Sequence, residues 1–326
     1  MAARASRTPC RRRPPSRIIP VATIADAIAS ASERLSRSSD SPLLDAQLLM
    51  SHVLKRERPW LLAHGDAELP RNEYAHFRRL AKRRGEGVPV AYLIQSAGFY
   101  GREFTVHSGV LVPRPETEHL VERALAEIDR LAPGDAVLRV LDVGTGSGAI
   151  AVTVACERPR VRVMATDRSN EALALARTNA LRHGVAERVT LLAGELHEAA
   201  AVHAPFDVVL ANLPYVPTGD LPQIPESAAY EPRFALDGGG DGLVLYRRLL
   251  PALPRMLRAG GVVLMEAAPP TIDGLASLAR SAFAGAEVEI VIDYGGRARV
   301  VCVLTRELGS ASRNSTTQSE PSSSHA

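Results

Sequence analysis

The clearest chemical signal in the sequence is a run of four residues, Asn212, Leu213, Pro214 and Tyr215. An asparagine side chain offers a carbonyl acceptor and an NH2 donor, a proline stiffens the backbone, and a tyrosine adds a flat ring with a polar tip. This set suits a planar amino or amide nitrogen, because two acceptors take its two N–H groups while a ring holds its plane. Motifs of four residues also match by chance, so a loop with an ordinary turn proline is an equal alternative for these residues alone.

The segment before this tetrapeptide indicates where it lies in the fold. Residues 206–211 form an apolar run that is typical of a buried strand. In open α/β sheets, ligands bind at the edge where the strands have their carboxyl ends. We therefore expect the tetrapeptide at the ligand-binding edge of a sheet.

A glycine-rich loop at residues 144–148 follows another predicted strand. Its glycines stand at alternate positions, which lets the backbone turn tightly and approach a ligand, while the next helix presents free N–H groups. The spacing departs from the G-x-G-x-x-G fingerprint of dinucleotide sites, so the loop alone indicates only a nucleotide site. The candidate cofactor-binding residues here are Gly144, Thr145, Gly146, Ser147 and Gly148.

Asp167 ends the next predicted strand, 23 positions after Gly144 (167 less 144). A carboxylate at this place accepts hydrogen bonds from both hydroxyls of a ribose, so an adenosine-containing cofactor is implied. The alternative is that Asp167 caps the following helix, a role that Ser169 or Asn170 could also fill. We favour the cofactor, because strand, glycines and carboxylate are in register. Leu196, after a further strand, is a weaker candidate for contact with the adenine.

From residue 137 onward, apolar runs alternate with amphipathic stretches. The expected strands are 137–142, 161–167, 189–193, 206–211, 261–266, 287–293 and 300–304. The expected helices are 149–157, 170–183, 243–257 and 271–284. This alternation predicts an α/β fold with a mainly parallel sheet and helices on both of its faces.

The first part of the chain has a different pattern. Apolar residues at helical spacing predict a small helical module over residues 21–84, with helices from Ile24, from Pro42 and over residues 71–84. Residues 85–115 predict a linker with a β-hairpin that turns near Gly101. A helix over residues 116–131 then opens the larger domain, which we expect to span residues 116–308.

Composition narrows the class of protein. A hydrophobic content of 46% supports a real core, and no apolar run is long enough to span a membrane, so we expect a soluble protein. Six arginines lie in the first 17 residues, and the rest holds 33 basic against 36 acidic residues, a net charge of −3. That balance argues against a broad phosphate-binding surface. The three cysteines are far apart and no Cys/His cluster has zinc spacing, so we expect no metal site.

The two ends of the chain are expected to be disordered, over residues 1–20 and 309–326. The basic N-terminus also has the composition of an organellar transit peptide, although its prolines do not suit an amphipathic helix. Lysine occurs twice against 37 arginines, which is typical of a GC-rich genome. We therefore favour a bacterial, cytoplasmic protein.

With these residues in place, the chain is similar to the class I S-adenosylmethionine-dependent methyltransferases, which have a seven-stranded Rossmann-like sheet. More closely, it resembles the protein-glutamine N5-methyltransferases of the HemK/PrmC family, which modify class 1 peptide-chain release factors. The resemblance covers about residues 21–305. Beyond the site residues, it rests on residues 45–49, 89–93, 99–104, 112–118, 230–232, 236–239 and 241–243.

The resemblance implies S-adenosyl-L-methionine as the cofactor and the glutamine of the release factor's Gly-Gly-Gln loop as the substrate. It implies a monomer with no direct nucleic-acid binding, whose helical module helps to engage the release factor. The side-chain oxygen of Asn212 and the carbonyl of Leu213 would accept the two amide N–H bonds, with Tyr215 against the amide plane. The implied substrate-binding residues are Asn212, Leu213, Pro214, Tyr215, Arg114 and Glu116. The implied cofactor-binding residues are Gly144, Thr145, Gly146, Ser147, Gly148, Asp167, Leu196 and Asn212.

Two positions depart from the family pattern. The family usually has a proline where this chain has Leu213, so a fixed φ is lost and an N–H is gained. It often has aspartate and an aromatic residue at the positions of Glu195 and Leu196. The alternatives are glutamine methylation of a ribosomal protein, adenine-N6 methylation of nucleic acid, whose exocyclic amine also presents two N–H groups, and a non-catalytic S-adenosylmethionine-binding protein.

Overall fold

The computed structural model describes residues 22–132, 136–224 and 226–306. The expected disordered ends, 1–20 and 309–326, lie outside the described residues. Contacts divide the chain into two compact units, Met1–Glu86 and Gly87–Ala326. No helix among the described residues is long and apolar enough to cross a membrane.

From residue 22 to residue 86, the described part of the N-terminal unit is a group of four helices, three of which were predicted. The expected apolar face of the first helix is buried, from Ile24 to Leu35. The short third helix was missed, because six residues give too little periodicity to detect. Arg84 donates from Nε to the Asp45 carboxylate at 2.6 Å and ties the last helix to the second. The helices are α1 (Ile24–Leu35), α2 (Pro42–Leu54), α3 (Arg58–Ala63) and α4 (Arg71–Gly85).

The second unit begins with a short helix and the predicted hairpin. Strands β1 (Ser96–Phe99) and β2 (Arg102–Thr105) are antiparallel and turn through Tyr100 and Gly101, both at positive φ. Helix α5 (Val90–Ile94) was not predicted. The expected helix over 116–131 is present as α6 (Glu118–Leu131), preceded by a 3-10 turn over Pro115–Thr117.

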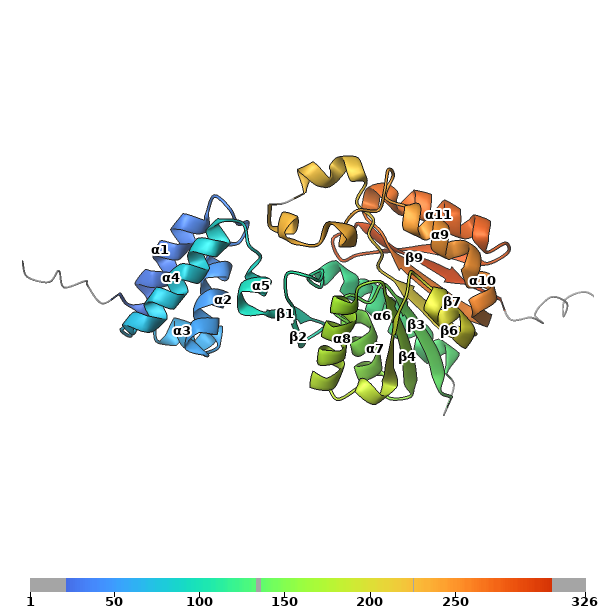
Figure 1. The fold of residues 1–326 in the computed structure, drawn as a ribbon, viewed down its shortest axis with the longest axis horizontal. Coiled ribbons are helices and arrows are strands. Elements are labelled where there is room, and N and C mark those ends of the chain that lie inside the picture. The colour runs from blue at the N-terminus through green and yellow to red at the C-terminus, as the bar shows by residue number, and fades with distance from the viewer. Residues whose placement is uncertain (1–21, 133–135, 225, 307–326) are drawn as a thin grey trace, which may run out of the picture. The chain divides into compact units, whose positions relative to one another are not determined.

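The centre of this unit is a seven-stranded sheet in the order β5-β4-β3-β6-β7-β9-β8 (Figure 1). Strand β9 is antiparallel to both of its neighbours, and the other pairs are parallel, as a mainly parallel sheet requires. All seven predicted strands are present, and β7 begins four residues earlier than expected. The strands are β3 (Leu138–Val143), β4 (Val161–Asp167), β5 (Val189–Ala193), β6 (Phe206–Ala211), β7 (Leu257–Glu266), β8 (Glu287–Ile292) and β9 (Ala298–Leu304).

Two apolar cores lie on opposite faces of the sheet. Along β6, Val208 and Leu210 belong to one core and Val209 and Ala211 to the other, as the two-residue period of a strand dictates. The first core packs against α6, α7 (Ala149–Glu157) and α8 (Asn170–Arg182). The second packs against α9 (Val244–Leu249), α10 (Leu253–Met256) and α11 (Pro269–Ala282), which Figure 1 shows on the other side.

The prediction of one helix over residues 243–257 is wrong. It is split into α9, a 3-10 turn over Leu250–Ala252, and α10. Pro251 and Pro254 are the reason, because each lacks a backbone N–H and its ring clashes with the preceding turn. The resulting bend keeps both short helices against the sheet.

The parallel register brings the candidate residues to one edge. Val143 of β3 is aligned with Thr166 of β4 and with Ala211 of β6. Ala211 is in turn aligned with Met265 of β7. The following residues therefore stand side by side at the carboxyl edge of the sheet. These residues are Gly144, Asp167, Asn212 and Glu266.

Candidate active site

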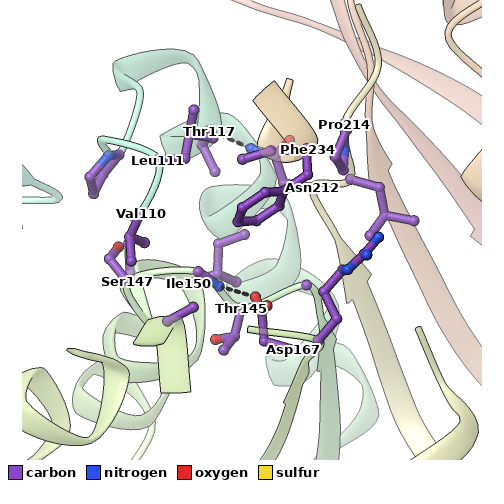
Figure 2. Close-up of a pocket in the computed structure, with 18 of the residues that line it drawn as sticks. Val110, Leu111, Thr117, Thr145, Ser147, Ile150, Asp167, Asn212, Pro214 and Phe234 are labelled. Atoms are coloured by element: carbon purple, nitrogen blue, oxygen red, sulfur yellow. Dashed lines mark hydrogen bonds between the residues drawn. The ribbon is translucent and has the colours of Figure 1, made fainter. Parts of the chain in front are cut away.

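A cavity that is open to solvent lies at this carboxyl edge (Figure 2). The glycine loop, Asp167, Leu196 and the tetrapeptide line it, together with the segment that leads into α6. Of the residues implied for the site, the following line the cavity: Arg114, Gly144, Thr145, Gly146, Ser147, Asp167, Leu196, Asn212, Leu213 and Pro214. Among the described residues, Gly148, Tyr215 and Glu116 are not part of this lining.

The glycine loop requires glycine at two points. Gly144 has a φ of +77°, and a Cβ there would lie 2.9 Å from the Cδ2 of Leu213. Gly148 has a φ of +79°, and its Cβ would lie 3.0 Å from the Cβ of Ala176. Gly148 is thus needed where α7 crosses α8, and it positions the loop without lining the cavity. The N-terminus of α7 follows directly.

Asp142 supports the loop from below. It is fully buried, and its Oδ2 accepts a hydrogen bond from the Thr145 hydroxyl at 2.7 Å. Its Oδ1 has no partner in the described part of the chain. Burial, partly offset by the Thr145 hydrogen bond, raises the pKa of Asp142 to about 7.

Asp167 faces the cavity from the end of β4. Its Oδ2 accepts from the backbone N–H of Gly146 at 2.9 Å, and its Oδ1 accepts from that of Ser169 at 2.8 Å. Burial raises the pKa of Asp167, and these two hydrogen bonds oppose the rise. The capping role falls instead to Ser169, whose hydroxyl accepts from Ala172 N at the start of α8. The carboxylate therefore keeps lone pairs for a ligand.

Leu196 is held in a conformation that a leucine rarely adopts. Its φ is +50°, and its carbonyl accepts a hydrogen bond from the Thr166 hydroxyl at 2.6 Å. Left-handed backbone at a residue other than glycine costs roughly 1–3 kcal/mol and persists only where the surroundings fix it. In this backbone conformation, Leu196 is one of the residues that line the cavity.

Asn212 is oriented by a threonine that lies 95 residues earlier in the chain. Its Nδ2 donates to Oγ1 of Thr117 at 3.0 Å, the dashed line beside Thr117 in Figure 2. Thr117 is buried, at the end of the 3-10 turn before α6. Among the described residues, no group donates to Oδ1 of Asn212 or to the carbonyl of Leu213. Two acceptors of the tetrapeptide therefore remain available.

The N–H that Leu213 adds relative to a proline has a partner. It donates to the hydroxyl of Tyr246, from α9, at 3.2 Å. Tyr246 is fully buried, and its hydroxyl proton is shared between the carbonyl of Glu266 and that of Ala211, the latter at 3.3 Å. One phenol thus ties the ends of β6 and β7 to the backbone of Leu213.

Tyr215 and Glu266 interact behind the tetrapeptide. The Tyr215 hydroxyl donates to Oε1 of Glu266 at 3.3 Å, while Oε2 has no hydrogen-bond partner in the described ranges. Burial raises the pKa of Glu266 to about 7, against the opposing effects of the Thr117 and Tyr215 hydroxyls. Burial also raises the pKa of Tyr215 strongly. The phenol is therefore neutral and donates.

Arg114 and Glu116 occupy different places. The Arg114 guanidinium lines the cavity and forms an ion pair with the buried carboxylate of Glu231. Val112 N also donates to this carboxylate, at 3.4 Å. Glu116 lies 3.8 Å from the guanidinium of Arg299, outside the cavity lining of the described residues. Arg114 therefore connects the segment before α6 to the segment that carries Glu231.

Three polar residues of this arrangement, Thr117, Tyr246 and Glu266, were not predicted from the sequence. Thr117 lies within the family-like stretch 112–118, so the sequence indicated that this segment matters but did not indicate the contact of Thr117 with Asn212. Glu266 is a single polar residue in an apolar segment, and Tyr246 lies between an apolar run and two arginines. No spacing connects either of them with the tetrapeptide. Only the fold brings them together.

Known families match both parts of the chain. The PrmC N-terminal domain family matches residues 26–94, and a family described as methyltransferase domain matches residues 135–271. Among solved structures, the hMettl16 catalytic domain in complex with a MAT2A 3′UTR hairpin has a TM-score of 0.51 at 11% identity, over 69% of this chain and 81% of that one. At that identity the likeness concerns the fold alone.

Curated relatives extend over most of the chain. The release factor glutamine methyltransferase of Moorella thermoacetica is 39% identical over 87% of this chain and 99% of its own length. Proteins of the same name from Xylella fastidiosa and Bacillus subtilis are 41% and 38% identical, over 73% and 79% of this chain and 82% and 90% of their own. The chain belongs to the release factor glutamine methyltransferase family.

Proposed function

We propose that this protein transfers a methyl group from S-adenosyl-L-methionine to the side-chain amide nitrogen (N5) of the glutamine in the Gly-Gly-Gln loop of class 1 peptide-chain release factors. The observation that carries the proposal is the pair of unpaired acceptors, Oδ1 of Asn212 and the carbonyl of Leu213, at the carboxyl edge of a methyltransferase fold. Relatives of that name over most of the chain support the same substrate.

The cavity has the groups that the cofactor needs. Asp167 supplies a carboxylate for ribose hydroxyls, the glycine loop supplies a backbone that a ligand approaches closely, and Ile150 and Leu196 supply apolar walls for a purine. We therefore assign cofactor binding to the glycine loop, Asp167, Leu196 and Asn212, with Gly148 as the support of the loop.

When bound, S-adenosylmethionine would supply a methyl group already activated by its sulfonium. The bond from the amide nitrogen to this methyl would form as the S–C bond breaks, which would leave a neutral thioether and release one amide proton to water. The task of the protein is to place a poor nucleophile, because the lone pair of an amide nitrogen is delocalised into its carbonyl. Asn212 Oδ1 and the Leu213 carbonyl would accept the two N–H bonds and raise the electron density on nitrogen as positive charge develops. Pro214 limits the motion of this backbone.

The remaining implied residues surround this point. We give the ring of Tyr215 the role of flanking the amide plane, with its hydroxyl anchored on Glu266. Arg114 would shape the substrate-side wall through Glu231, and Glu116 would contact the substrate from outside the cavity. The N-terminal unit, which matches the PrmC N-terminal domain family, would engage the release factor. We expect a cytoplasmic monomer that acts without binding nucleic acid.

The test is transfer of radiolabelled methyl from S-adenosylmethionine to a purified release factor. A factor with its loop glutamine replaced by alanine is the matched substrate control, and Asn212→Ala is the matched enzyme control. We expect label on the natural factor only, and none with Asn212→Ala even at S-adenosylmethionine concentrations that saturate that variant. Label on both factors would assign a different residue. Label on neither would support another substrate or a protein that binds the cofactor without turnover.

A further inference from the structure

We propose that Thr117 and Glu266 are positioning residues that fix the orientation of the Asn212 side chain, so that its oxygen and not its NH2 group faces the substrate nitrogen. This inference rests on the proposed function for the identity of the substrate. Its geometric basis is the hydrogen bond from Asn212 Nδ2 to Thr117 Oγ1 at 3.0 Å, together with the buried Glu266 carboxylate, which accepts from Tyr215.

An asparagine needs such a device because its amide has two ends of similar shape and opposite hydrogen-bonding character. With the oxygen toward the substrate, Asn212 accepts an amide N–H, and with the NH2 toward the substrate, two donors face each other. A neighbour that only accepts on the Asn212 side selects the first orientation. Thr117 fills that place from a buried position.

A threonine hydroxyl is not an acceptor only, because it also carries one proton. That proton needs another acceptor if the lone pairs are to face Asn212. The Tyr215 hydroxyl donates to Oε1 of the Glu266 carboxylate at 3.3 Å, and the Thr117 hydroxyl lowers the pKa of this carboxylate against the effect of burial. An ionised carboxylate has no proton to give. Ionised Glu266 therefore directs both hydroxyl protons toward itself and away from Asn212.

Thr117 and Glu266, which we call the relay, lie on rigid elements. Thr117 lies at the junction of the 3-10 turn and α6, where its N–H donates to the carbonyl of Arg114 at 3.1 Å. Glu266 is the last residue of β7, and its carbonyl accepts from the buried Tyr246. Sites that are built on such elements hold their geometry better than sites on loops.

Protonation of Glu266 would reverse the relay. The neutral acid donates, so the Thr117 proton is free to turn toward Asn212, which favours the flipped amide. Besides burial, the groups that shift the pKa of Glu266 are the Thr117 and Tyr215 hydroxyls and the Arg299 guanidinium on β9, which lower it, and the Glu116 carboxylate before α6, which raises it. Burial dominates their sum and raises the pKa of Glu266 to about 7. Activity should therefore fall as the pH is lowered through 7.

The first experiment compares Thr117→Val, which removes the hydroxyl at nearly constant shape, with Thr117→Ser, which keeps it. We expect Thr117→Val to lower kcat roughly 10- to 100-fold, since a misplaced group costs about that much, with less than about a threefold change in KM and in the Kd for S-adenosylmethionine. Thr117→Ser should stay within about threefold of the natural protein. Equal kcat values for the two variants would overturn the relay.

The second experiment is the pH profile of kcat for Glu266→Gln between about pH 6 and 9. Glutamine does not titrate in this range, so the decline of activity below pH 7 should disappear. The same acidic limb in Glu266→Gln as in the natural protein would contradict the role of Glu266.

A third readout needs no substrate and separates this inference from the proposed function. The sequence has five asparagines, so selective 15N labelling gives few side-chain amide signals, and Asn212→Asp identifies the one of interest. The Asn212 NH2 signal should be protected from exchange in the natural protein and in Thr117→Ser, and exposed in Thr117→Val. If release factors are not methylated but this pattern holds, the function is wrong and the relay stands. If the signal is unprotected in the natural protein, the relay is wrong.

Discussion

Replacing Tyr246 with phenylalanine removes a single oxygen that serves three backbone groups. The N–H of Leu213 would lose its acceptor, and the carbonyls of Glu266 and Ala211 would lose a donor. The phenyl ring still fills the same space, so no cavity opens. A buried N–H without a partner costs about 1–3 kcal/mol, and we expect the free energy of unfolding to fall by about 2 kcal/mol.

The assay is thermal and urea unfolding of the larger unit by circular dichroism. A loss of about 2 kcal/mol corresponds to a Tm that is about 4–8 °C lower for a domain of this size. Tyr294→Phe is the matched control, because Tyr294 is 88% exposed and, within the described ranges, its hydroxyl bonds to the half-buried Glu122 carboxylate alone. The control should unfold within about 0.5 kcal/mol of the natural protein.

Catalysis should respond to the same change. The Leu213 carbonyl is one of the two proposed acceptors, and its peptide would no longer be held at its N–H. We expect kcat for Tyr246→Phe to fall about tenfold while the Kd for S-adenosylmethionine stays within about threefold. A variant that unfolds like Tyr294→Phe and keeps its kcat would refute the view that Tyr246 immobilises the leucine.

Three further predictions concern the cofactor half of the site. Gly148→Ala places a Cβ at positive φ against Ala176, so the free energy of unfolding should fall by about 1–3 kcal/mol in urea titrations, and an unchanged midpoint would contradict the close approach. Asp167→Asn should raise the Kd for S-adenosylmethionine about tenfold or more by calorimetry, whereas an unchanged Kd would remove Asp167 from the ribose site. Burial raises the pKa of Asp142 and that of Glu266 to about 7, above their unfolded values, so the folded state holds protons that the unfolded state has released. The free energy of unfolding should thus fall as the pH rises from about 4 through 7, and Asp142→Asn should flatten this slope, which equal slopes would disprove.

Much of the fold could be predicted because its periodicities are long and clear. Strands β4, β5 and β6 and helix α7 have the predicted bounds, since each is a mainly apolar segment between polar turns. The helix over 243–257 was wrong because the apolar spacing continues through Pro251 and Pro254, which local chemistry does not allow in one helix. Helices α3 and α5 are too short to show a period.

The site was predictable only where residues are adjacent in sequence or follow a strand. The glycine loop, Asp167 and the tetrapeptide meet this condition, because parallel strands carry their carboxyl ends to one edge. Thr117 reaches Asn212 across 95 residues, and Glu266 lies a further 54 positions along the chain from Asn212 (266 less 212). A single polar side chain in an apolar segment gives no period and no motif, so its partner is known only from the fold.

The most direct test of the central claim is tandem mass spectrometry of the Gly-Gly-Gln peptide from a release factor that has been incubated with the protein and S-adenosylmethionine. Asn212→Ala under the same conditions, with cofactor binding checked separately, is the control. We predict one added methyl group on the side-chain nitrogen of the loop glutamine with the natural protein, and none with Asn212→Ala. An unmodified glutamine, or a methyl group that Asn212→Ala adds equally well, would contradict the account.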